Sequence, residues 1–197
     1  MKQQILVIHG GDSYASYDDY LKEITDRPLQ LEWMRSGRSW KGSLQEVLGA
    51  SYDVLSPYFP LRENARYEEW KVVFEKVFEL LDENVILIGH SLGGIFLAKY
   101  LSEHTPTKKI KALFLVAAPY TMETPYSAEF NITDAAPIQE KVSDVFIYHS
   151  KDDAVVSFTH AERYQKDIPL AHTRFFADKG HFNMESLPEI LDDIQSL

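Results

Sequence analysis

Short runs of apolar and often β-branched residues alternate along the chain with longer segments that are only partly apolar. The runs predict six strands, at residues 5–9, 52–56, 85–89, 112–117, 145–149 and 173–176. Most of them are continuously apolar, which is typical of strands that are buried on both faces of a parallel sheet. Strands that alternate with helices in this way predict a doubly wound α/β domain.

Three of the intervening segments have apolar residues at helical spacing, and we expect these faces to pack against the core. The last helix is predicted to begin with a capping box formed by Ser186 and Glu189, with Pro188 in its first turn. The three apolar faces consist of Tyr17, Tyr20, Leu21 and Ile24; Trp70, Val73, Phe74, Val77, Phe78 and Leu81; and Leu187, Ile190, Leu191 and Ile194.

Two stretches interrupt the alternation. Residues 27–51 contain Trp33, Trp40 and a predicted short helix near residues 44–48, and residues 119–141 contain three prolines and several aromatic residues. Connections of this length in a compact domain usually serve as functional loops or lids. No segment has the pattern of a strongly amphipathic lid, so an interfacial lipase is not expected. With no linker or internal repeat, residues 1–197 are interpreted as a single domain.

Composition and charge reduce the number of function classes that the chain can belong to. The chain has 197 residues, no cysteine and a formal net charge of −10. The charge argues against broad electrostatic binding to nucleic acid or to an anionic membrane. The lack of cysteine excludes a thiol nucleophile, and no histidine pair has a compact zinc-ligand spacing, so we expect no metal site. The first apolar run is too short for a signal peptide, and we therefore expect a cytoplasmic protein.

The chemistry is concentrated first in the stretch GHSLGG, residues 89–94, between a predicted buried strand and a predicted helix. A serine at a sharp strand-to-helix turn projects its hydroxyl above the sheet, and the residues two before and two after it must be small. Gly89 and Gly93 meet that requirement around Ser91. The same turn leaves the N–H of Leu92 at a helix N-terminus, where it can face an oxyanion.

A serine nucleophile needs a general base, usually a histidine held by a carboxylate, and in this architecture the chain order is serine, acid, histidine. Asp152 and Asp153 follow the fifth predicted strand, and His181 follows the sixth. Both loops lie at the carboxyl ends of strands, where the ligand crevices of α/β sheets open. These considerations do not distinguish Asp152 from Asp153. A second oxyanion donor is expected from the loop after the first strand, at the N–H of Gly11, with Asp12 pointing away.

These residues resemble the α/β-hydrolase superfamily, and within it the small serine hydrolases similar to retinoblastoma-binding protein 9. The resemblance is carried by IHGG near the start, SPYFPLRENARYEEW, GHSLGG, HSKDDAVVSF and the late GHF. It implies a three-layer fold with a mostly parallel six-stranded sheet in the order 2-1-3-4-5-6. It also implies that Asp153 is the acid, because the family's acid usually stands three residues before an apolar residue, here Val156, that is followed by a proline. Here Ser157 replaces that proline.

The resulting hypothesis is a cofactor-free serine hydrolase with a Ser91–His181–Asp153 triad and an oxyanion hole at Leu92 and Gly11. Small carboxylic esters, thioesters or amides are the expected substrates, with Trp40 and Tyr120 as candidate substrate-binding residues, although such aromatics are often ordinary core. The alternatives are a hydrolase-fold binding or regulatory protein with little activity, and an acyltransferase or peptidase that uses the same triad. A protein partner is possible under either reading and is not indicated by the sequence.

Overall fold

A six-stranded sheet in the order β2-β1-β3-β4-β5-β6 organises the computed structural model, which describes residues 2–31 and 39–197. Every neighbouring pair of strands is parallel. The predicted order 2-1-3-4-5-6 is therefore confirmed, and each predicted strand is present with ends shifted by a few residues at most. The strands are β1 (Gln3–Ile8), β2 (Tyr52–Leu55), β3 (Val85–His90), β4 (Ile110–Val116), β5 (Val142–Ser150) and β6 (His172–Phe176).

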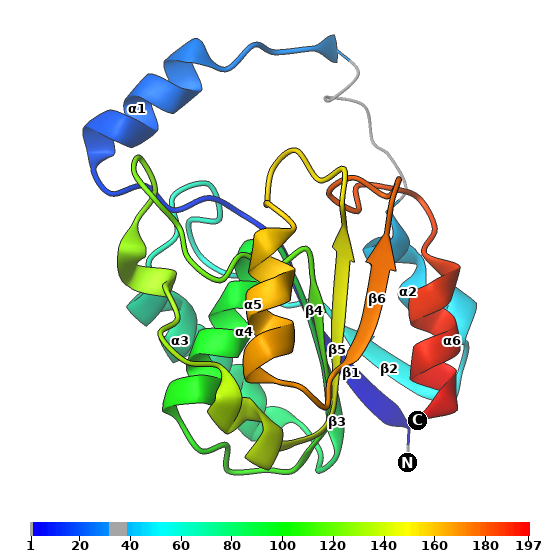
Figure 1. Cartoon of the computed structure of the whole chain (residues 1–197). Helices are drawn as coiled ribbons and strands as arrows, with labels where there is room; N and C mark the ends of the chain where they lie inside the picture. Colours follow the sequence, from blue (N-terminus) through cyan, green and yellow to red (C-terminus); the bar gives the residue numbers. More distant parts are fainter. Residues whose placement is uncertain (1, 32–38) are drawn as a thin grey trace.

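Helices cover both faces of the sheet and make a three-layer sandwich (Figure 1). One face packs against α3 (Tyr67–Leu80), α4 (Leu92–Glu103) and α5 (Thr159–Asp167), and the other against α2 (Trp40–Leu48) and α6 (Pro188–Ser196). Successive side chains of a strand point to opposite faces, so β1 supplies Leu6 to the first core and Ile5 to the second. Burial of both faces explains why the strands are continuously apolar.

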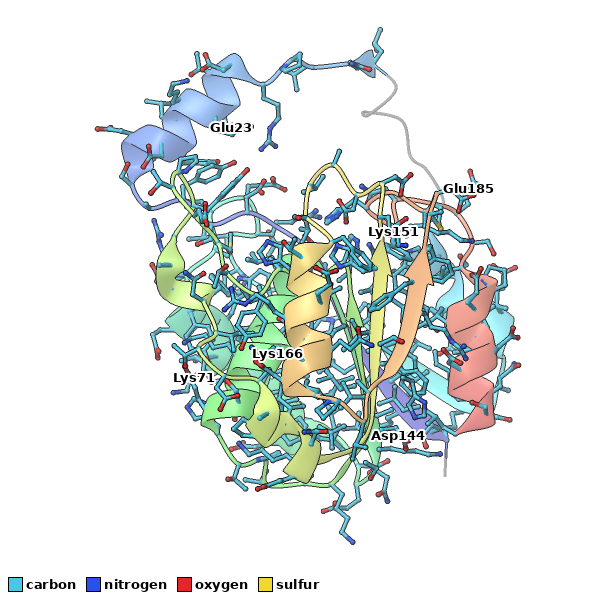
Figure 2. All side chains as sticks on the ribbon, in the orientation of Figure 1. Glu23, Lys71, Asp144, Lys151, Lys166 and Glu185 are labelled. Carbon is cyan, nitrogen blue, oxygen red and sulfur yellow. The ribbon has the colours of Figure 1, made fainter. Side chains whose placement is uncertain are left out.

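Helix α1 (Tyr17–Asp26) departs from the prediction that its apolar stripe packs against the core. None of its residues is buried, and Tyr17, Leu21 and Ile24 remain exposed. The helix, on which Glu23 is labelled in Figure 2, projects beyond the carboxyl edge of the sheet and lies apart from the three layers (Figures 1 and 2). Tyr20 keeps a contact with the loop after β1, where its ring centroid is 5.7 Å from that of Tyr14. The sheet face that a first crossover helix would cover is occupied by α2 instead. The predicted helix is therefore present, but its apolar side is exposed and does not pack against the core.

The start of α6 also differs from the prediction. The helix begins at Pro188 after Leu187, and no side chain caps it, so the capping box of Ser186 and Glu189 does not form. The Glu189 carboxylate lies 3.0 Å from the ammonium group of Lys179. Proline at the first helical position needs no N–H partner, which makes a side-chain cap less necessary there.

The two long connections contain short elements of their own. The first holds α2, and the second holds two 3₁₀ turns, η2 (Ala128–Phe130) and η3 (Ala136–Glu140). Trp33 lies outside the described residues. Of the helices in the described ranges, none combines the length and the apolar character that a bilayer crossing requires.

Candidate active site

Ser91 sits in a strained turn between β3 and α4. Its backbone has φ 54° and ψ −121°, a region that residues with a Cβ seldom adopt. The turn is held because the N–H of Ser91 donates to the carbonyl of Val116 at 2.9 Å. A Cβ on Gly89 would lie 2.5 Å from the carbonyl oxygen of Gly93, and one on Gly93 would lie 2.5 Å from that of Ile8. Only glycine fits at either position.

The loops after β5 and β6 bring a carboxylate and an imidazole together. The Oδ2 atom of Asp153 lies 2.8 Å from Nδ1 of His181, and the Asp153 side chain has no exposed surface. Its other oxygen, Oδ1, accepts hydrogen bonds from the N–H groups of Val155 at 2.8 Å and Val156 at 2.9 Å. These backbone donors fix the carboxylate so that Oδ2 faces the imidazole.

Asp152 has a different place in the same loop. Its side chain is turned toward the β5 end and the histidine loop, where Oδ1 accepts hydrogen bonds from the hydroxyl of Ser150 and, at 2.9 Å, from the N–H of Gly180. No described contact joins Asp152 to the ring of His181. The two adjacent carboxylates thus have different partners. Asp153 contacts the imidazole of His181, whereas Asp152 accepts a hydrogen bond from the backbone of the loop that carries His181.

Hydrogen bonding outweighs burial at Asp153. Burial on its own would raise the pKa of this carboxyl group. The hydrogen bond from His181, followed by those from the N–H groups of Val156 and Val155, reverses the effect and lowers its pKa below the ordinary value. Asp153 is therefore ionised at neutral pH. The Nε2 atom of His149 lies 3.8 Å from the same Oδ2 and donates instead to the carbonyl of Val156 at 2.9 Å.

The histidine loop also touches the serine turn. Nε2 of His90, the residue before Ser91, lies 2.9 Å from the carbonyl oxygen of His181, and the centroids of the two imidazole rings are 5.0 Å apart. Among the hydrogen bonds of the described residues, none joins the Ser91 hydroxyl to His181. Hydrogen bonds between nucleophile and base are often long in ligand-free enzymes and tighten when substrate binds.

A cavity of about 550 Å³ opens beside Ser91. Both Gly11 and Leu92 line it, and neither N–H donates in any described loop or turn hydrogen bond. A Cβ on Gly11 would lie 2.2 Å from the carbonyl oxygen of Arg62, so the β1 loop can pass this close only with glycine. The remaining wall residues are Asp12, Pro119, Thr121, Met122, Glu123, Thr124, Tyr126, Val155, Val156, Ser157, Thr159, His160 and Arg163.

Asp12 lines the cavity but is engaged by a cation. Its Oδ2 atom lies 3.3 Å from the Arg27 guanidinium, just after α1. Burial raises the pKa of Asp12, and the hydrogen bond from Arg27 opposes part of that rise. The arginine therefore offsets negative charge that would otherwise face the cavity.

The two candidate substrate-binding residues belong to the core instead. Trp40 is 2% exposed and Tyr120 is 1% exposed, and neither lines the cavity. The indole N–H of Trp40 donates to the carbonyl of Phe182, and the hydroxyl of Tyr120 donates to Asp167. Tyr126, by contrast, does reach the cavity. Both residues were candidates because they lie in the long connections of the chain. Large aromatic side chains are usually buried, and these two are part of the core.

Several site residues carry no sequence signal of their own. Met122, Val155 and Val156 form apolar wall, and only their position after β4 and β5 at the carboxyl edge would have suggested it. Lys41 on α2, whose ammonium group lies 3.0 Å from Nδ1 of His90, is one of 20 basic residues and stands in no motif. Within the part of the chain that the structure describes, no cluster of three histidine or acidic side chains is arranged to bind a metal ion.

A serine turn at the carboxyl edge of a parallel sheet, beside a buried carboxylate–imidazole pair, is the arrangement of an α/β hydrolase. The family model described as serine hydrolase matches residues 33–195, and the chain belongs to that family. A comparison with curated protein sequences finds no match.

Solved structures share the fold at low sequence identity. The ydeN gene product of B. subtilis superposes with a TM-score of 0.70 at 19% identity, over 99% of this chain and 98% of that one. A carboxylesterase of the thaumarchaeon Nitrososphaera gargenis gives a TM-score of 0.62 at 13% identity, over 99% and 89% of the two chains. An esterase from Rhodococcus sp. gives a TM-score of 0.55 at 13% identity, over 99% of this chain and 90% of that one. These likenesses establish the α/β-hydrolase fold, and the family match makes the chain a serine hydrolase.

Proposed function

We propose that the protein hydrolyses small carboxylic esters, or related thioesters or amides, through Ser91, His181 and Asp153. The observation that carries the proposal is the 2.8 Å contact between Asp153 and His181, next to the strained turn of Ser91. A role in binding alone would place no demand on these three groups. The motifs near the start and in the acid loop further suggest that, within the superfamily, the chain groups with hydrolases similar to retinoblastoma-binding protein 9.

The chemistry is acyl transfer in two halves. The hydroxyl of Ser91 attacks the substrate carbonyl while Nε2 of His181 takes its proton, and the resulting imidazolium is stabilised by ionised Asp153. The N–H groups of Leu92 and Gly11 donate to the tetrahedral oxyanion. His181 then protonates the leaving alcohol, thiol or amine, and an acyl-enzyme remains on Ser91. Water activated by His181 attacks that ester and releases the acid.

The cavity bears on the kind of acyl group. Its volume of about 550 Å³ is within the range of small-molecule sites, which is roughly 300–1,000 Å³. Met122, Val155 and Val156 provide apolar wall, whereas Thr121 and His160 provide polar groups on neighbouring surfaces. We therefore expect a short or medium acyl chain with some polar character to fit better than a long alkyl chain.

The test combines covalent labelling with kinetics. The wild-type protein should react with a fluorophosphonate probe at one residue, identified as Ser91 by peptide mass mapping, and Ser91→Ala should not react. A series of p-nitrophenyl esters from acetate to laurate should show a maximum at short or medium chains, and aminoacyl amides and alternative acceptor alcohols test peptidase and transferase activity. Ser91→Ala with unchanged turnover, or a wild-type protein that the probe does not label, would refute the proposal.

A further inference from the structure

The first turn of α2 is fastened to the loop that carries His181. The indole N–H of Trp40 donates to the carbonyl of Phe182 at 2.9 Å, and the backbone N–H of Trp40 donates to the carbonyl of Met184 at 3.1 Å. The next residue, Lys41, places its amine 3.0 Å from Nδ1 of His90. His90 in turn contacts the carbonyl of His181 at 2.9 Å through Nε2. A helix distant in sequence thus reaches the histidine loop along two routes.

The acceptor at His181 fixes the donor and acceptor roles in the chain of contacts from Lys41 through His90 to His181. The carbonyl oxygen of His181 can only accept, so Nε2 of His90 must carry the hydrogen. A neutral imidazole then presents a lone pair at Nδ1, and that lone pair faces the donor hydrogens of Lys41. The hydrogen bonds therefore run from Lys41 to His90 and from His90 to His181. The opposite tautomer would place a hydrogen of Nδ1 against the amine and a lone pair of Nε2 against a carbonyl oxygen.

Burial and charge keep His90 in the neutral form that this direction requires. Burial lowers the pKa of His90 well below its ordinary value, and the positive charge of Lys41 lowers it further. The pKa of Lys41 is itself lowered to about 8, by burial first and by the charge of Arg62 second. Whether protonated or neutral, the amine still carries hydrogens that it can donate to His90.

We propose that Lys41 is a positioning residue for His181, acting through His90, which transmits its orientation to the carbonyl of the histidine. The proposal rests on the function proposed above. His181 is then held at two points: Asp153 fixes the ring at Nδ1, and His90 fixes the backbone from the serine side. Without the Lys41 donor, His90 loses the partner that selects its tautomer and ring orientation, and the carbonyl of His181 loses a fixed donor.

The reaction should respond in kcat more than in KM. Lys41 does not line the cavity, so its loss leaves the contacts with substrate intact. Small misplacements of a catalytic group can lower rates by about 100-fold, and we expect Lys41→Met to lower kcat by about 10- to 100-fold with KM changed less than about 3-fold. The rate of fluorophosphonate labelling should fall in parallel. Lys22→Met on the exposed side of α1 is the matched control and should leave both constants unchanged.

Chemical rescue separates positioning from packing. The chain has no cysteine, so Lys41→Cys introduces its sole thiol. Alkylation with 2-bromoethylamine builds a lysine isostere at residue 41, whereas 1-bromopropane builds a side chain of the same shape without the amine. We expect the aminoethyl form to recover most of the wild-type kcat and the propyl form to remain as slow as Lys41→Met. Equal recovery with both reagents would show that residue 41 acts by packing alone.

A pair of substitutions at His90 provides a second readout. The amide nitrogen of glutamine can occupy the place of Nε2 and donate to the carbonyl of His181, while asparagine is too short to do so. His90→Gln should therefore retain a larger share of kcat than His90→Asn, at equal thermal stability. If both variants and Lys41→Met keep the wild-type kcat while Ser91→Ala is inactive, the positioning role is wrong and the proposed function stands. If Ser91→Ala is active, the proposed function itself fails.

Discussion

Oδ2 of Asp153 lies 2.8 Å from Nδ1 of His181, although the two residues are 28 positions apart. The contact joins the loop after β5 to the loop after β6, two neighbouring strands at the edge of the sheet. Because the Asp153 side chain is fully enclosed, a change at this residue acts on the imidazole without much compensation by water.

The two adjacent acids should differ sharply in their effect on catalysis. If the proposed triad operates, Asp153→Asn removes the negative charge and favours the wrong tautomer of His181, so kcat should fall by about 10³- to 10⁴-fold. Asp152→Asn weakens the hydrogen bond that the N–H of Gly180 donates to the side chain of residue 152. This change should lower kcat less than about 10-fold. Steady-state kinetics on one ester, with circular dichroism to verify folding, make the comparison. A larger loss in Asp152→Asn would reverse the assignment of the acid.

The backbone of Ser91 should store measurable strain. Its φ of 54° is disfavoured for a residue with a Cβ, and such positions cost about 1–3 kcal/mol. We expect Ser91→Gly to unfold at higher urea concentration than Ser91→Ala, by about 1 kcal/mol in the free energy of unfolding, because glycine adopts this conformation readily. Both variants lack the hydroxyl, so their difference reports the backbone. Equal midpoints would mean that the turn holds no strain.

The Gly11 loop should be intolerant of a single methyl group. In Gly11→Ala the new Cβ would meet the carbonyl oxygen of Arg62, which belongs to the backbone and cannot swing away. We expect the loop to shift and to move the Gly11 N–H away from the proposed oxyanion position. Losing one such donor is worth about 2.7–4 kcal/mol of barrier, so kcat should fall by about 10²- to 10³-fold.

Gly42→Ala on α2, where the nearest atom is the Ser39 hydroxyl at 3.3 Å, serves as the control and should keep its activity. A Gly11→Ala protein with normal turnover and a displaced loop would exclude this N–H from the oxyanion hole. The crystal structure of the variant would then show whether the loop moved or the methyl group was accommodated.

Buried neutral histidines should make the fold sensitive to mild acid. The pKa of His90 and that of His149 lie below the ordinary value of 6.5, chiefly because burial disfavours the charged ring. As the pH falls below 6.5, the unfolded chain takes up protons that the folded chain refuses. The free energy of unfolding should therefore fall by up to about 1.4 kcal/mol per pH unit for each such histidine.

Urea unfolding at pH 7.5, 6.5 and 5.5 measures this slope, and His149→Gln should reduce it because glutamine does not titrate. Parallel pH profiles for the wild type and His149→Gln would show that His149 gains its proton equally in both states.

The sequence by itself determined the features that depend on neighbouring residues. The Ser91 turn could be predicted because the clash that selects Gly89 is local and involves the backbone of Gly93 and Gly94 in the first helical turn. The clash that selects Gly93 is with the carbonyl of Ile8 on the neighbouring strand β1, and only the known strand-turn-helix pattern made it predictable. The strands could be predicted because burial on both faces leaves continuous apolar runs. A family resemblance added the strand order and favoured Asp153, which local chemistry could not separate from Asp152.

Tertiary structure decided what depends on a partner far away in the chain. The stripe of Tyr17, Leu21 and Ile24 specifies an amphipathic helix but not what it packs against, and α2 occupies the face that α1 would cover. Trp40 looked like a substrate contact and is instead a buried donor to Phe182. Lys41 acquires its relation to His90 because the fold sets α2 beside the serine turn. Helical periodicity records which side of a helix is apolar, while the identity of the neighbour is set by the packing of the whole chain.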